Sequence, residues 1–471
     1  MLHCSLRRLL LAFLAGVSLP APTRAAEPAS TGSLEGWNPT AIRDEIRPEF
    51  SVDTTGGRDH HGALVISTDG RPGLMGYWIK NFPVEGGRHY RFQAFRRIKN
   101  VAIPRRSVNA RIVWLDEKGK VAYRDLPVVG PYHPKGQPDL STAEFPADRA
   151  TDGEGWTELS GVYRAPATAR DASIELHLEW AESARVEWSG VSLTETSPPP
   201  PRKVRLATIH YIPLGKTPAE NCRQFASLIA DAAKQKADLA VLPETLTHTN
   251  TGLTYADAAE SVPGPSTEYF SSLAQQHQLH LVVGLLERAE HVVYNVAVLI
   301  GPQGEIIGKY RKVCLPRPEV EMGITPGSDY PVFETRFGKV GMMICYDGFF
   351  PEVARELANR GAEVIAFPVA GCNPLLAAAR ACENHAYVVS STYCDVSRNW
   401  MISGVYGHQG EVLAQATKWG SVAVAEVDLD SPTIWGNIGD YKAQLLRHRP
   451  PTADEQKAAA AAQKTPAANG K

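Results

Sequence analysis

The chain has 471 residues, too many for one hydrophobic core, so its length favours two or more domains. Its 49 basic and 51 acidic residues nearly balance, which argues against a basic nucleic-acid-binding surface. Beyond its first residues, no apolar run is long enough to span a bilayer as a helix. We therefore expect neither a nucleic-acid partner nor a membrane contact in the mature chain.

The first residues have the composition of an export signal. Arg7 and Arg8 precede the apolar run Leu9 to Leu19, and small residues surround Ala25. This order predicts a cleaved signal peptide at residues 1–25. A short membrane anchor is the alternative, and the brevity of the apolar run argues against it. The signal predicts an exported protein, either periplasmic or extracellular.

Export makes disulfides possible, and the chain holds seven cysteines. Cys4 would leave with the signal peptide. If Cys345 is a free nucleophile, the remaining five allow at most two bridges, and their spacing fixes no pairing. No paired CxxC motif is present, so we expect no structural zinc site.

Between residues 30 and 195, apolar and polar residues alternate with the period of a half-buried strand. In Ser173–Trp180, Ile174, Leu176 and Leu178 share one face, and charged residues share the other. Similar alternation marks three further stretches: Tyr90–Phe95, Ala110–Leu115 and Val186–Leu193. The pattern predicts an antiparallel β-sandwich domain over 30–195, with one face of each sheet in the core.

Aromatic residues are concentrated in this predicted domain. Six of the nine tryptophans lie there: Trp37, Trp78, Trp114, Trp156, Trp180 and Trp188. They fit either a core filling or a sugar-binding face. The strand order, with Tyr77-Trp78 early and Trp156–Tyr163 late, resembles the galactose-binding-like jelly rolls of secreted hydrolases. The resemblance implies an accessory domain with a structural calcium ion as a candidate ligand, and it assigns no residue; carbohydrate is a candidate ligand only on the evidence of the tryptophans. We interpret Asp59-His60-His61 as a polar loop rather than a metal site.

A proline-rich linker follows at residues 196–202, where four consecutive prolines form a stiff, extended spacer. From residue 203 to 447, buried strands alternate with amphipathic helices, such as the helix expected over Pro218–Lys234. This order predicts an α/β domain with helices covering its sheets. The tail at 448–471, rich in alanine, lysine and proline, is expected to be disordered.

The stretch Val340–Glu352 combines a strand, a cysteine and a helix start. Its apolar run ends on Cys345, Asp347-Gly348 forms a turn, and Pro351 suits the first turn of a helix. This arrangement would expose the thiol near a helix N-terminus, whose dipole favours the nucleophilic thiolate. A buried, inert cysteine is the alternative.

Two more residues of the α/β region occupy similar positions at predicted strand ends. Glu244 follows the apolar strand that ends at Leu242. Lys312 comes directly after another predicted strand, further along the chain. Groups at strand ends converge in α/β folds. A carboxylate can take the proton of a thiol, and a lysine together with the backbone N–H of Tyr346 can stabilise an oxyanion.

Residues 203–430 resemble the nitrilase superfamily of carbon–nitrogen hydrolases, which carry a Glu-Lys-Cys triad. The triad maps onto Leu242-Pro-Glu244, Tyr310-Arg-Lys312 and Ile344-Cys-Tyr346. Supporting motifs are Thr325-Pro-Gly327, Phe349-Phe-Pro-Glu352 and Arg380-Ala-Cys-Glu383-Asn384. The resemblance implies a four-layer α-β-β-α sandwich, a homodimer or higher oligomer, and cofactor-free hydrolysis of a small amide, N-carbamoyl or nitrile substrate through a thioester.

The resemblance also implies residues that support the triad. Arg380, Glu383 and Asn384 share one helix face at i, i+3 and i+4. Either Glu319 or Glu321 would orient the lysine, with Glu321 slightly preferred. Cys314 stands where many family members have histidine. Among pocket loops we expect Thr245–Thr254, Cys372-Asn-Pro374 and Arg398-Asn-Trp400.

Overall fold

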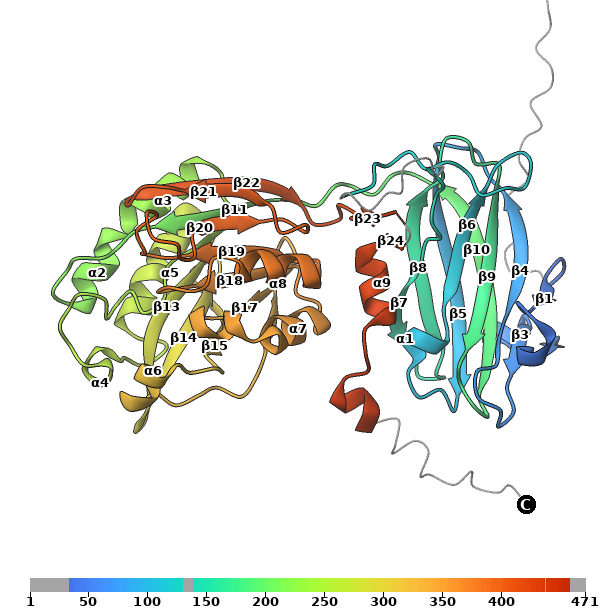
Figure 1. Ribbon diagram of the computed structural model, residues 1–471, viewed down its shortest axis with the longest axis horizontal. Helices are drawn as coiled ribbons and strands as arrows, with labels where there is room; N and C mark the ends of the chain where they lie inside the picture. Colours follow the sequence, from blue (N-terminus) through green and yellow to red (C-terminus); the bar gives the residue numbers. More distant parts are fainter. Residues whose placement is uncertain (1–33, 130–138, 437, 458–471) are drawn as a thin grey trace, which may run out of the picture.

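The computed structural model describes residues 34–129, 139–436 and 438–457. They form an all-β unit and an α/β unit, which lie side by side and are joined by an extended segment (Figure 1). The signal peptide expected at 1–25 lies outside the described residues. Within the described part of the chain, no helix is both long and apolar enough to cross a membrane.

The all-β unit contains two antiparallel sheets. One is ordered β1-β4-β9-β6 and the other β2-β3-β10-β5-β8-β7. The strands are β1 Asn38–Thr40, β2 Glu49–Asp53, β3 Ala63–Ser67, β4 Met75–Pro83, β5 His89–Lys99, β6 Ala110–Leu115, β7 Ala147–Thr151, β8 Thr157–Arg164, β9 Asp171–Glu179 and β10 Arg185–Thr196. The short helices are η1 Asp44–Ile46, η2 Arg58–His60 and α1 Pro104–Ser107. The predicted alternation therefore corresponds to strands with antiparallel pairing.

Tryptophans fill the core of this unit. Trp37, Trp78, Trp114, Trp156 and Trp188 are buried, whereas Trp180 is half-exposed. One expectation for strand β9 was wrong, because His177 and Glu179 on its predicted solvent face are also buried. His177 lies between Glu175 and Glu179, and Arg111 of β6 pairs with Glu179 at 2.6 Å. Partners from neighbouring chain segments thus replace water on this face.

The α/β unit has two six-stranded sheets, ordered β15-β14-β13-β12-β11-β22 and β16-β17-β18-β19-β20-β21. The strands of the first sheet are β11 Lys203–His210, β12 Leu239–Val241, β13 His280–Ala289, β14 Val292–Ile300, β15 Ile306–Arg311 and β22 Ser421–Asp428. Those of the second are β16 Val332–Glu334, β17 Lys339–Met342, β18 Val364–Pro368, β19 Tyr387–Ser391, β20 Ser403–Tyr406 and β21 Val412–Ala416. Parallel pairing of β11–β12–β13 and of β17–β18–β19 confirms the α/β class.

Helices cover these sheets. The helices that follow residue 203 are α2 Pro218–Gln224, α3 Ala226–Lys234, α4 Tyr255–Ala258, α5 Pro265–His277, α6 Arg317–Glu321, η3 Cys345–Phe349, α7 Pro351–Asn359, α8 Leu376–Asn384 and α9 Tyr441–His448. Helices α3 and α5 pack on strands of the first sheet, while α7 and α8 pack on strands of the second. The helix predicted over Pro218–Lys234 is divided at Phe225.

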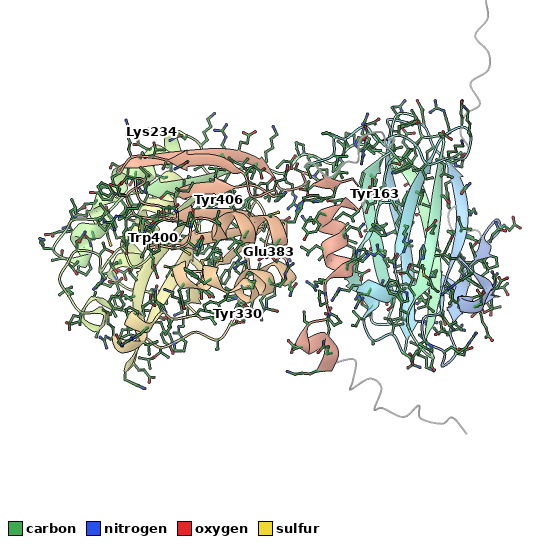
Figure 2. All side chains as sticks on the ribbon, in the orientation of Figure 1. Tyr163, Lys234, Tyr330, Glu383, Trp400 and Tyr406 are labelled. Atoms are coloured by element: carbon green, nitrogen blue, oxygen red, sulfur yellow. The ribbon has the colours of Figure 1, made fainter. Side chains whose placement is uncertain are left out.

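The C-terminal segment lies between the two units (Figure 1). After the short strands β23 Ile434–Trp435 and β24 Gly439–Asp440, helix α9 packs against α1. Arg105 of α1 donates to the Leu446 carbonyl at 2.9 Å and pairs with Glu455 at 2.6 Å. On the other side, the Tyr441 hydroxyl donates to the backbone of Glu383, at the edge of the α/β unit (Figure 2). Disorder was therefore wrongly expected for residues 448–457, and residues 458–471 lie outside the described part.

Candidate active site

Three buried charged side chains form one cluster at the strand ends. The Lys312 ammonium, directly after β15, donates to Glu244 Oε1 at 2.8 Å and to Glu319 Oε1 at 2.5 Å. Glu244 follows β12, and its second oxygen accepts from the Ala370 backbone N–H at 2.8 Å. Lys312 is 1% exposed and Glu244 2% exposed. The cluster is therefore a desolvated ion-pair network whose geometry is fixed from several elements.

The cluster controls the charge of its members. Burial alone would lower the pKa of Lys312, but attraction to Glu244, Cys345 and Glu319 outweighs burial and raises it. Burial raises the pKa of Glu319, and the nearby lysine opposes that rise. The Asn295 amide of β14 donates to Glu244 at 2.8 Å and to Glu319 at 3.4 Å. Lys312 thus stays cationic where a developing oxyanion would need it.

Cys345 lies next to this cluster, in a strained turn. Its backbone φ is +41°, a left-handed conformation that is uncommon for residues other than glycine. The thiol is 9% exposed and donates to the Gly371 carbonyl at 3.1 Å. Burial and the Glu244 carboxylate raise its pKa well above the ordinary value, and Lys312 opposes them only in part.

This environment corrects two expectations about the nucleophile stretch. Strand β17 ends at Met342 rather than at Cys345, because the residues from 345 to 349 form the 3-10 helix η3. Helix α7 begins at Pro351, as predicted, but η3 separates it from Cys345, and the pKa of the thiol is raised rather than lowered. A raised pKa means that the resting thiol is neutral and needs a base.

A buried aspartate holds the turn of Cys345 in place. Asp347 Oδ2 accepts from the Ile344 N–H and from the Tyr310 hydroxyl, both at 2.8 Å. Its Oδ1 accepts from the Cys314 N–H at 2.8 Å. Asp347 is fully buried, and burial raises its pKa. The residue expected only to form a turn therefore ties the nucleophile stretch to the segment that carries Lys312.

Helix α8 supports the same turn from the other side. The Arg380 guanidinium donates to the Gly348 carbonyl at 3.0 and 3.2 Å and to Glu383 at 2.9 Å. The Asn384 amide donates to the Arg380 carbonyl at 2.9 Å. Arg380 and Asn384 are buried. The three residues predicted to share a face of this helix therefore interact, and Arg380 connects them to η3.

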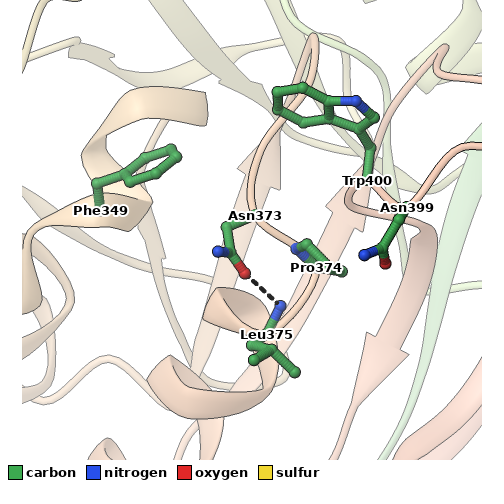
Figure 3. A pocket seen from close by; sticks show the side chains of 6 residues that line it. All are labelled: Phe349, Asn373, Pro374, Leu375, Asn399 and Trp400. Carbon is green, nitrogen blue, oxygen red and sulfur yellow. Dashed lines mark hydrogen bonds between the residues drawn. The ribbon is translucent and has the colours of Figure 1, made fainter.

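A pocket of about 480 Å³ is lined in part by Phe349 of η3, the 3-10 helix that begins at Cys345. Figure 3 shows the six side chains that line it: Phe349, Asn373, Pro374, Leu375, Asn399 and Trp400. Phe349 ends η3, and Asn373 lies two residues after Gly371, the acceptor of the Cys345 thiol. Two of the three loops expected to line a pocket, around residues 373 and 400, contribute to it, whereas no residue of 245–254 is among its lining.

The α/β unit has clear relatives among known proteins. The sequence profile described as carbon-nitrogen hydrolase matches residues 204–436. A protein named nitrilase from Pyrococcus abyssi is 36% identical over 241 residues, which are 48% of this chain and 90% of that protein. The human omega-amidase NIT2 is 31% identical over 245 residues, 48% of this chain and 88% of that protein. This chain belongs to the carbon-nitrogen hydrolase family.

As a member of this family, in the nitrilase superfamily, the protein is an enzyme that hydrolyses carbon–nitrogen bonds other than peptide bonds. Solved structures similar to it include Nit3 of Saccharomyces cerevisiae, at 26% identity and TM-score 0.44, covering 48% of this chain and 90% of that one. An amidase from Nesterenkonia sp. has 24% identity and TM-score 0.42, covering 48% of this chain and 91% of that one.

The structure of this carbon-nitrogen hydrolase distinguishes the two candidate glutamates. Glu319 contacts Lys312, whereas Glu321 is exposed and pairs with Arg317 at 2.6 Å on the surface of α6. The preference for Glu321 was wrong, because the two residues lie on different faces of a short helix. Tyr346 follows Cys345 within η3, so its backbone N–H is adjacent to the nucleophile.

Sequence reasoning missed Asn295. This side chain is 1% exposed and contacts both glutamates of the cluster. The sequence feature that could have identified Asn295 is a single amide side chain within the otherwise apolar run of β14. A polar side chain buried in such a strand needs a hydrogen-bond partner, so it indicates a polar site. The six described cysteines are free thiols. The described residues hold no group of three or more His, Cys, Asp or Glu side chains placed to share a metal ion.

Proposed function

We propose that the protein is an exported hydrolase that cleaves a non-peptide amide or N-carbamoyl bond through a cysteine thioester. The observation that carries this proposal is the convergence of Glu244, Lys312 and the strained Cys345 at one set of strand ends. A neutral thiol beside a carboxylate and a cation is suited to attack on a carbonyl carbon.

In the first half-reaction, Glu244 takes the proton of the Cys345 thiol as sulfur attacks the carbonyl carbon. Lys312 and the backbone N–H of Tyr346 stabilise the negative charge that develops on the carbonyl oxygen. Glu244 then returns the proton to the leaving nitrogen. The C–N bond breaks, ammonia or an amine departs, and the acyl group remains on sulfur as a thioester.

In the second half-reaction, Glu244 takes a proton from water, and the hydroxide attacks the thioester carbonyl. The C–S bond breaks, sulfur recovers the proton, and the carboxylic acid leaves. One water is consumed in each cycle. Glu319 and Asn295 position Lys312 and Glu244 by direct hydrogen bonds, while Asp347 and Arg380 hold the turn of Cys345.

Two other reactions use the same triad: nitrile hydrolysis and acyl transfer to an amine. The relatives named omega-amidase support the amide, and the relative named nitrilase keeps the nitrile as a second candidate. A panel of amides, N-carbamoyl compounds and nitriles separates them when the acyl product is measured beside ammonia and amine release, because hydrolysis forms a carboxylic acid and acyl transfer forms a new amide. We expect amide hydrolysis that vanishes in the Cys345→Ala variant without loss of fold. Full activity in that variant would refute the mechanism.

We propose further that residues 30–195 form a galactose-binding-like jelly-roll domain. Residues 196–202 link it to a hydrolase domain at 203–447, and this hydrolase domain is a four-layer α-β-β-α sandwich. The buried tryptophans favour the interpretation that they fill the core of the first domain over the interpretation that they form a sugar-binding face. The other reading, a polysaccharide-binding protein with secondary hydrolase activity, predicts retention of the Cys345→Ala protein on a polysaccharide panel. Failure across the panel would leave the domain structural.

Export and assembly are further parts of the proposal. Amino-terminal sequencing of the protein from its producing cells should find a mature chain that starts near residue 26. A homodimer or higher homo-oligomer is expected by light scattering. The Tyr441 contact with Glu383 places the chain's own C-terminal segment beside α8, which reduces the surface left for a second copy there.

A further inference from the structure

The pocket at the end of η3 has an uncharged, mainly apolar lining. Four of its six residues are apolar, namely Phe349, Pro374, Leu375 and Trp400, and the other two are asparagines. Leu375 is 72% exposed, Trp400 46% and Phe349 43%. Large apolar side chains left in water around one cavity usually mark a binding site.

This pocket is connected directly to the nucleophile. The Gly371 carbonyl accepts from the Cys345 thiol at 3.1 Å. A Cβ atom added to Gly371 would lie 3.6 Å from Cε3 of the Trp400 indole. The Cys394 sulfur, at 3.1 Å from the same Cβ position, and the Trp400 indole therefore both lie against Gly371, whose carbonyl accepts from the reactive thiol. The indole is thus the aromatic surface that we expect an acyl group on the Cys345 sulfur to meet.

The charges around the site argue against an anionic substituent. Lys312 is already engaged by Glu244 and Glu319, and none of the six lining side chains is cationic. Placing a carboxylate in this pocket would remove it from water without a counter-charge. A neutral aromatic or alkyl group would instead bury apolar surface there, and the amides of Asn373 and Asn399 can bond a neutral polar edge.

Resting on the proposed function, we infer that the acyl part of the substrate is uncharged and carries an aromatic or branched alkyl group, which binds between Trp400, Leu375 and Phe349. The volume of the pocket, about 480 Å³, is in the range of roughly 300–1,000 Å³ that is usual for pockets that bind small molecules. Acyl chains that end in a carboxylate are poor substrates on this reading. Trp400 and Leu375 then set specificity, whereas the triad sets the reaction.

The test compares three amides with the full-length enzyme: 3-phenylpropionamide, glutaramate and acetamide. We expect kcat/KM for 3-phenylpropionamide to exceed that for glutaramate by about tenfold or more. Trp400→Ala should lower kcat/KM for 3-phenylpropionamide by about tenfold and change that for acetamide by less than about threefold. Leu375→Ala should show the same selectivity more weakly. Leu214→Ala is the matched control, because Leu214 is 64% exposed and lies outside the pocket lining.

The possible failures are distinguishable. Preference for glutaramate, lost in an Arg398→Gln variant, would overturn the inference and assign an anionic acyl group, while the proposed function would stand. Equal effects of Trp400→Ala on all three amides would also overturn it. Hydrolysis that persists in Cys345→Ala would overturn the proposed function and this inference with it. No hydrolysis of any of the three amides would overturn this inference alone, because the proposed function is tested by the wider panel.

Discussion

Lys312 shows how one charge can determine both stability and chemistry. Two buried carboxylates, Glu244 and Glu319, face its ammonium group, and Asn295 connects them. A buried ion pair gains little over an apolar replacement of both partners, but removing one partner leaves the other charge uncompensated. The lysine is thus needed to keep two acids together before it takes part in any reaction.

Lys312→Met should therefore reduce the free energy of unfolding by about 3–5 kcal/mol, as well as remove activity. Urea denaturation followed by circular dichroism measures the loss. Lys309→Met is the matched control on the same strand: Lys309 is partly exposed, and its partner Glu287 keeps Arg311 at 2.7 Å. We expect about 1 kcal/mol or less for the control. Equal losses in both variants would contradict the argument.

The protonation state of Cys345 gives a second prediction at this scale. Because burial and Glu244 raise the thiol pKa, alkylation of Cys345 by iodoacetamide should be slow at pH 7 and still accelerate at pH 9. Peptide mass spectrometry separates this thiol from the other five.

Glu244→Gln provides the matched comparison for that experiment. It removes the neighbouring negative charge, so the thiol pKa should fall and alkylation below pH 9 should become faster. A wild-type rate that is already at its plateau at pH 7 would mean that the resting enzyme holds a thiolate.

At the scale of elements, η3 and α8 together define the nucleophile turn. The left-handed φ of Cys345 costs about 1–3 kcal/mol, so neighbouring elements must hold it. Asp347 does so from within the turn, and Arg380 does so from α8 through the Gly348 carbonyl. Supporting residues thus act on the reaction through the position of one backbone segment.

Arg380→Ala should lower kcat by about 10–100-fold with little change in KM, because a charge-assisted hydrogen bond is worth about 1.5–3 kcal/mol. The variant should stay folded by circular dichroism. Arg355→Ala is the control, since Arg355 also touches α8, through the Glu383 carbonyl at 3.0 Å, but does not contact Gly348. Unchanged kcat in Arg380→Ala would exclude the positioning role.

The elements also show what sequence reasoning could and could not predict. The positions of Glu244 and Lys312 at the ends of strands were predictable from the sequence, because apolar runs of strand length indicate buried strands. The choice between Glu319 and Glu321 was not, because it depends on where α6 begins and which face it turns to Lys312. Likewise, the last strand residue before Cys345 depends on η3, a turn that apolar periodicity does not reveal.

At the scale of the whole molecule, the C-terminal segment connects both units. Arg105 of the all-β unit and Glu455 are 350 residues apart in sequence, so no local pattern could pair them. The composition of the tail, rich in alanine, lysine and proline, predicted disorder because it holds no large apolar side chain to bury. The first part of the tail is ordered instead, because Arg105 pairs with Glu455 and donates to the carbonyls of Arg449 and Pro450.

The Arg105–Glu455 pair gives this connection a pH dependence. Hydrogen bonds from Arg105 lower the pKa of Glu455 to about 2, from an ordinary value of 4.5. A carboxylate whose pKa is lowered by folding stabilises the folded state above the ordinary pKa, and the stabilisation is lost as pH falls toward the folded value. The contact should therefore be complete at pH 7 and weaken progressively below about pH 4.5.

Glu455→Gln should accordingly make hydrogen exchange faster at pH 7 in peptides covering residues 441–457. We expect the protection factor to fall by about threefold or more, because a partly exposed ion pair is worth up to about 1 kcal/mol. Asp454→Asn is the adjacent control: its carboxylate is 95% exposed and only 3.7 Å from Lys457. The difference between wild type and Glu455→Gln should shrink between pH 5 and pH 3, after correction for intrinsic exchange. If the difference between the two proteins stays constant over that range, the charge of Glu455 does not hold the segment. The hydrogen bonds from the Arg105 guanidinium to backbone carbonyls of the segment would then hold it.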